Sequence, residues 1–159
     1  MPWDLPYEVE VLPRGAVLRA ARDGVCLTKQ LTATEAGLLA NYRLEPGGPA
    51  AARLSVEVRA CPLAPGRKAD SAAARSFAGG VRVMQPGSTG GLLIRGQFDH
   101  SWERIVAAGA TLSGVEHLVQ GVAVTIAPRT AGGELEIELI PEGAGPSPRP
   151  GGGGARAAR

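Results

Sequence analysis

The sequence predicts an all-β protein, an antiparallel β-sandwich or jelly roll of about eight to ten short strands. Two segments carry this prediction, because residues 53–60 (RLSVEVRA) and 134–140 (ELEIELI) alternate polar and apolar side chains. Successive side chains on a strand point to opposite faces, so the alternation places one face in a core and the other in water. In addition, 23 Gly and 13 Pro divide the 159 residues into short pieces, as turns between strands do.

The first half of the chain divides into five strand-like runs. In chain order, we expect strands at residues 7–12, 16–22, 25–31, 38–45 and 53–60. The second and third runs flank Asp23-Gly24. This dipeptide predicts a hairpin with a type I′ turn, because Gly accepts the positive φ that the turn requires. A Pro-Gly-Gly-Pro turn signal ends the fourth run.

The second half of the chain supplies four further strands. We expect them at residues 81–85, 92–98, 122–126 and 134–140. Residues 62–76 contain two prolines and an Ala run that is too short for a stable helix, so we expect a surface loop there. Residues 101–108 are ambiguous, since Trp102, Ile105 and Val106 have helical spacing but a glycine cuts the run short.

The same patterns predict the core and the limits of the domain. We expect the core to include Leu54, Val56, Val58, Leu135, Ile137 and Leu139. From Gly143 onward the chain lacks large apolar residues and is rich in Gly, Pro and Arg. Such a segment does not bury enough apolar surface to offset its ordering entropy. We therefore predict a β-sandwich domain over residues 1–142 and a disordered tail over residues 143–159.

Composition and charge limit the possible functions and cellular locations of the protein. Aromatic residues make up only 4% of the chain, so we expect no deep stacking platform for bases or sugars. The net charge of +2 does not require nucleic acid or a membrane surface as a partner. The N-terminus lacks a signal-peptide pattern, and no apolar run has the length of a membrane span. We therefore expect a cytoplasmic, nuclear or virion protein.

No residue pattern predicts an active site, a metal site or a cofactor site. Asp99-His100-Ser101 has the residue types of a nucleophilic triad, but adjacent residues on a strand face opposite ways and do not converge. Cys26 and Cys61 lie in or beside separate strand-like runs, which favours two small buried side chains over a disulfide. The histidines and cysteines lack the short ligand spacing of a structural zinc site. We therefore expect no enzyme, no metal and no cofactor.

Charged side chains form rows on the outer faces of the predicted strands. Solvation or cross-strand pairing explains most such rows, but two sharper interpretations stay open. A row of Glu protects an edge strand from aggregation, or it matches a basic surface on a partner. The tail offers nucleic acid only weak, salt-dependent contacts. The candidate interaction residues are Arg53, Arg59, Glu134, Glu136, Glu138, Arg149, Arg156 and Arg159.

Two β-sandwich families share local patterns with this chain. Residues 91–102 (GLLIRGQFDHSW) loosely resemble the late strand of GOLD domains, where an apolar strand runs into Phe-Asp-Asn and an aromatic residue. The layout of residues 25–31, 53–60 and 92–97 is similar to a nucleoplasmin-like core. The resemblances imply a module that binds a phosphorylated, lipid or histone-like partner. No residue role is carried over from either family.

These patterns favour a non-enzymatic interaction or assembly module, such as a homo-oligomeric structural subunit of a virion or scaffold. Its partner would be another protein or a second copy of the chain. The first alternative is the binding module for a phosphorylated, lipid or histone-like partner. The second is a small hydrolase built around Asp99, His100 and Ser101.

Overall fold

The protein folds into two packed antiparallel sheets, as predicted. The computed structural model describes residues 6–46, 53–60, 73–84, 90–111, 114–129 and 133–143. These residues form eleven β-strands in a sheet of eight and a sheet of three, which confirms the all-β sandwich. In the described ranges no helix has the length and apolar character needed to cross a membrane.

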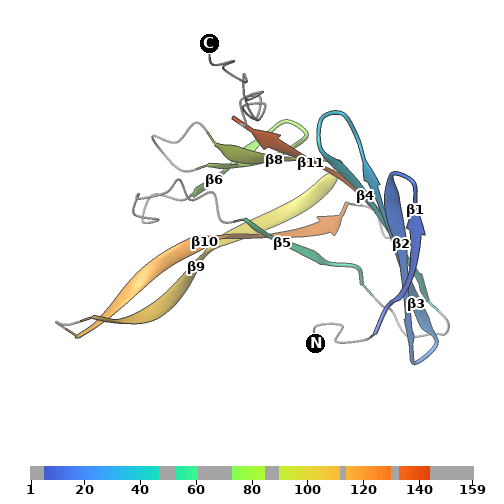
Figure 1. Ribbon diagram of the computed structural model, residues 1–159, viewed down its shortest axis with the longest axis horizontal. Helices are drawn as coiled ribbons and strands as arrows, with labels where there is room; N and C mark the ends of the chain where they lie inside the picture. Colours follow the sequence, from blue (N-terminus) through green and yellow to red (C-terminus); the bar gives the residue numbers. More distant parts are fainter. Residues whose placement is uncertain are drawn as a thin grey trace, which may run out of the picture.

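The larger sheet draws its strands from both ends of the chain. They are β1 (Glu8–Leu12), β2 (Gly15–Arg22), β3 (Val25–Ala33), β4 (Leu38–Pro46), β6 (Ala73–Phe77), β7 (Gly80–Met84), β8 (Gly91–Arg95) and β11 (Glu134–Glu142). Their order across the sheet is β1-β2-β3-β4-β11-β8-β7-β6. The strand β11 therefore lies in the interior of the sheet, between β4 and β8 (Figure 1).

The smaller sheet is built on a long hairpin. It contains β5 (Val56–Ala60), β9 (Phe98–Thr111) and β10 (Gly114–Pro128), with β10 in the centre. The strands β9 and β10 pair from Phe98 opposite Pro128 to Thr111 opposite Gly114, with one register shift between Val119 and Gly121. One end of this hairpin extends beyond the rest of the sandwich (Figure 1).

The core lies between the two sheets. The largest fully buried side chains are Val81, Val83, Ile94 and Ile137 of the larger sheet and Phe98, Val122, Val124 and Ile126 of the smaller one. Among the residues predicted for the core, Leu54, Leu135 and Ile137 are buried, and Val56, Val58 and Leu139 pack against them partly buried. The predicted core is thus confirmed. Full burial of one such aliphatic side chain contributes about 1.5–3 kcal/mol, which makes these rows a main source of stability.

The hairpin predicted at Asp23-Gly24 is also confirmed. Here φ is +51° at Asp23 and +77° at Gly24, and Arg22 pairs with Val25 across the turn. Positive φ at both central residues is the property of a type I′ turn. The turn sets the register of β2 against β3.

One local prediction is wrong and one ambiguity is resolved. Residues 73–76, predicted as part of a surface loop, belong to β6, where Ala74 is buried opposite Val83. Pairing with β7 and burial outweigh the low strand propensity of alanine. The ambiguous residues 101–108 are all strand, because they belong to β9 and pair with β10.

Some predictions concern residues outside the described ranges. The residues concerned are the tail beyond Gly143 with its three arginines, residues 62–72 of the predicted loop, and Cys61. The other cysteine, Cys26, is free and half-buried.

Candidate functional site

A pocket of about 660 Å³ lies on the larger sheet, where β3, β4 and β11 are neighbours. Its lining residues are Thr28, Gln30, Asn41, Tyr42, Arg43, Gly79, Gly96, Gln97, Glu134, Leu135 and Glu136. Ala40, Leu44, Leu135 and Ile137 of the same strands are buried in the core. Because side chains alternate along a strand, the polar residues between them point away from the core, and the pocket opens on the outer face of the sheet.

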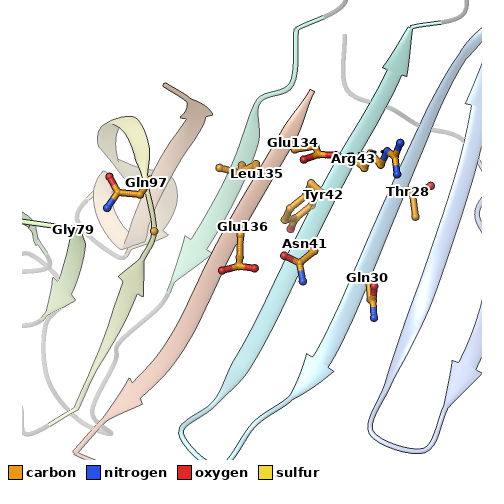
Figure 2. A pocket seen from close by; sticks show the side chains of 11 residues that line it. Thr28, Gln30, Asn41, Tyr42, Arg43, Gly79, Gln97, Glu134, Leu135 and Glu136 are labelled. Carbon is orange, nitrogen blue, oxygen red and sulfur yellow. Dashed lines mark ion pairs between the residues drawn. The ribbon is translucent and has the colours of Figure 1, made fainter. Parts of the chain in front are cut away.

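The floor of the pocket is a lattice of polar side chains on three neighbouring strands. One row runs across β3, β4 and β11 as Gln30, Asn41 and Glu136, which are register partners. Figure 2 shows these three side chains next to one another. Register partners on adjacent strands have Cβ atoms about 4.5–5.5 Å apart, so one small ligand can contact all three side chains.

In the second row of polar side chains, one arginine is balanced by nearby carboxylates. It consists of Thr28, Arg43 and Glu134 on the same three strands. The Nε atom of Arg43 lies 2.9 Å from Oε1 of Glu45 and 3.7 Å from Oε1 of Glu134. The guanidinium of Arg43 is therefore already matched by two carboxylates.

The first row, by contrast, has free hydrogen-bonding capacity. In the described part of the chain, the side chains of Gln30, Asn41 and Glu136 make no hydrogen bond or ion pair with other protein groups. Two amides and one carboxylate therefore face the pocket with donors and acceptors available to a ligand.

Two turns form the wall of the pocket beside β11. They contain Gly79 and Gly96-Gln97, and the backbone N–H of Gly96 donates a hydrogen bond of 3.0 Å to the carbonyl of Gly79. A Cβ on residue 96 would lie 2.6 Å from the carbonyl oxygen of Glu136. Glycine at position 96 thus lets the turn lie directly against β11.

Tyr42 supports the floor from the core side. It packs against the core, and Nζ of Lys29 lies 5.3 Å from the centre of its ring. Burial raises the pKa of the Tyr42 hydroxyl above its ordinary value of 10.0, and the nearby Tyr7 raises it further. Since neighbouring side chains alternate, the ring of Tyr42 lies on the opposite face of β4 from Asn41. The described floor side chains on the pocket face are therefore polar, without an aromatic ring to stack on.

The acidic and basic rows predicted from the sequence lie on different sheets. Glu134 and Glu136 line the pocket, and Glu138 follows them on β11, in register with Leu39 and Arg95. The interpretation that this Glu row protects an edge strand is wrong, because β11 is an interior strand.

Among the predicted basic residues, Arg59 lies on β5 of the smaller sheet and contacts Glu57 on its own strand. Arg53 is exposed and precedes that strand. The structure therefore does not pair these arginines with the Glu row. Arg149, Arg156 and Arg159 lie outside the described residues.

The residues of the apparent triad diverge. Nε2 of His100 lies 2.8 Å from Oγ of Ser76 on β6, whereas Oδ1 of Asp99 lies 3.4 Å from Nε of Arg129. Strand alternation places Asp99 and Ser101 on one face of β9 and His100 on the other. The three side chains therefore do not form a catalytic unit.

Sequence reasoning found the acidic half of the pocket and missed Thr28, Gln30 and Asn41. The sequence does indicate that these polar side chains face away from the core, because they alternate with mostly apolar side chains along their strands. Their significance depends on β4 lying beside β11, which no local pattern in the sequence reports.

Comparison with known proteins finds a similar fold in an enzyme of known structure. The sequence matches no family model and no curated protein. Among solved structures, the chain is similar to 4-alpha-glucanotransferase from Thermococcus litoralis, with 23% identity and a TM-score of 0.61. The match covers 87% of this chain and 22% of that chain. At this identity the likeness shows the fold alone, and the chain spans about a fifth of the length of the glucanotransferase.

The comparison corrects the function predicted from the sequence. The sequence predicts a non-enzymatic assembly module, such as a virion or scaffold subunit, but a solved protein that shares the fold is named as an enzyme, a 4-alpha-glucanotransferase. The alternatives that rested on GOLD-like or nucleoplasmin-like patterns receive no support, since no family model matches. Short alternating strands are common to many β-sandwiches, so they do not discriminate between functions.

Proposed function

We propose that this chain is a β-sandwich domain of a carbohydrate-active protein and that its outer-face pocket binds an α-1,4-linked glucan. The observation that carries the proposal is the row of Gln30, Asn41 and Glu136, whose side chains line the pocket without a protein partner in the described part of the chain. The row spans three neighbouring strands, whose pairing sets the spacing of the three residues.

The chemistry of the row suits a polyhydroxyl ligand. A hydroxyl group both donates and accepts hydrogen bonds, an amide offers both functions, and a carboxylate accepts two donors side by side. Gln30, Asn41 and Glu136 therefore complement neighbouring hydroxyls on a sugar ring. The absence of an aromatic ring among the described side chains of the floor predicts modest affinity, because stacking contributes a large part of the energy in tighter sites.

The structural comparison supports the same class of ligand. The glucanotransferase that shares the fold is more than four times as long as the matched region, since that region is 22% of its chain. We propose that the present domain likewise works beside other domains and holds glucan close to them.

We further propose that the domain binds glucan without cleaving it. Glycoside hydrolysis uses one carboxylic acid held in its protonated form and a second carboxylate across the scissile bond. The side chain of Glu134 is 76% exposed and lies 3.7 Å from Arg43, and Glu136 is also exposed. Neither carboxylate has the buried setting that a general acid needs.

Isothermal titration of the full chain with maltohexaose tests the proposal. We expect saturable binding, and about tenfold weaker binding for Asn41→Ala, a loss equivalent to about 1.4 kcal/mol. Thr125→Ala is the matched control, because Thr125 is exposed on β10 of the other sheet, and it should bind like the wild type. No binding of maltohexaose, or equal binding by the Asn41 variant, would contradict the proposal.

A further inference from the structure

We infer that the pocket selects neutral saccharides and rejects anionic ones, such as uronic acid, sulfated or phosphorylated sugars. The inference rests on the proposed function and concerns its specificity. It follows from the charges around the pocket: the nearby arginines are matched by carboxylates, whereas the carboxylate of Glu136 has no basic partner in the described part of the chain. A site that binds anions would instead present an excess of positive charge.

The arginines near the pocket are already matched by carboxylates. Arg43 contacts Glu45 and Glu134. At the wall, Nη1 of Arg129 lies 3.4 Å from Oε1 of Gln97, while Nε of Arg129 lies 3.4 Å from Oδ1 of Asp99. The positive charge of each guanidinium is therefore offset by neighbouring carboxylates.

On the same outer face, Arg19 of β2 is also matched by a carboxylate. Nη1 of Arg19 lies 3.1 Å from Oε2 of Glu10. Arg95, the register partner of Glu138 on β11, is not among the residues that line the pocket. Anion sites usually rely on an arginine that is free to bind the ligand with two parallel N–H groups, whereas the arginine that lines this pocket, Arg43, already contacts two carboxylates.

Glu136 leaves the pocket with an unmatched negative charge. It has no ion-pair partner in the described part of the chain, and its carbonyl oxygen is fixed beside the Gly96 turn. A carboxylate accepts hydrogen bonds from two hydroxyls of a neutral sugar without charge repulsion. The same carboxylate repels an anionic group brought into the same position.

The size of the expected effect follows from Coulomb's law. Two like charges about 4 Å apart at a protein surface repel enough to weaken binding about fivefold in a water-like dielectric, and more where water is displaced. We therefore expect at least about a fivefold preference for the neutral ligand at low salt. The preference should narrow as salt screens the pair.

The test compares maltohexaose with the same oligosaccharide after its primary hydroxyls are oxidised to carboxylates. Binding of each to the full chain is measured by titration calorimetry in about 20 mM and about 300 mM NaCl. We expect the wild type to bind the oxidised ligand at least about fivefold more weakly than maltohexaose at low salt. The ratio of the two affinities should be smaller at high salt and smaller in Glu136→Gln. The control Glu103→Gln removes the same charge from an exposed position on β9 and should keep the wild-type ratio.

The outcomes separate this inference from the proposed function. Equal binding of both ligands by the wild type would overturn the selectivity and leave glucan binding intact. An unchanged ratio in Glu136→Gln, with its melting temperature preserved, would also overturn it, since the discrimination would then lie elsewhere. Absence of binding by either ligand would overturn the proposed function itself.

Discussion

Gly96 determines how closely the wall of the pocket approaches β11, and alanine at this position tests that contact. A Cβ there would lie 2.6 Å from the carbonyl oxygen of Glu136 and 2.8 Å from the ring of Phe98. The backbone at Gly96 also has φ of +155°, which side-chain-bearing residues rarely adopt. Backbone strain costs about 1–3 kcal/mol, and overpacking adds about 1–3 kcal/mol. We therefore expect Gly96→Ala to lower the free energy of unfolding by about 2–6 kcal/mol.

Gly79→Ala is the matched control, because it isolates the backbone contribution. Gly79 has φ of +91°, but a Cβ there would meet no atom within 4 Å. Its replacement should cost only about 1–3 kcal/mol. Urea unfolding followed by tryptophan fluorescence, with linear extrapolation to water, measures both values. A cost for Gly96→Ala no larger than that for Gly79→Ala would refute the direct contact between the turn and β11.

Two further predictions concern the core and its dependence on pH. Ile137→Ala should lower the free energy of unfolding by about 2–5 kcal/mol, because Ile137 is 0% exposed between the sheets. Chemical denaturation measures this loss, and a value below about 1 kcal/mol would contradict the prediction. Tyr42 keeps its proton in the folded protein at pH values where the unfolded chain loses it, since its folded pKa is raised above 10.0. Stability should therefore fall as pH rises above about 10. Tyr42→Phe should reduce the loss of stability above about pH 10, measured by urea unfolding at a series of pH values. An equally steep loss in the variant would show that Tyr42 is not its cause.

Local patterns in the sequence predicted most of the strands and the core because both depend on short-range periodicity. Alternation at residues 53–60 and 134–140 identified the rows of side chains that are buried or partly buried in the structure. The Asp23-Gly24 turn was predictable because two residues determine its geometry. The strand β6 was missed because Ala73 and Ala74 acquire their strand structure only by pairing with β7.

The pocket could be predicted only in part, because strand order is a tertiary property. Glu134 and Glu136 were candidates from their alternation alone. Gln30 and Asn41 join them only because β11 returns from the end of the described chain to pair with β4, which also pairs with β3. The pairing places three polar residues in one row, and no propensity or turn signal in β3 or β4 anticipates it.

The most direct test of glucan binding at this pocket is a two-dimensional NMR titration of the isotopically labelled full chain with maltohexaose. We expect the side-chain amide signals of Gln30 and Asn41 and the backbone signal of Glu136 to shift together and to saturate. The backbone signal of Thr125, on the other sheet, should stay in place. Shifts confined to β5, β9 and β10, or no shifts at saturating ligand, would contradict binding at the outer-face pocket.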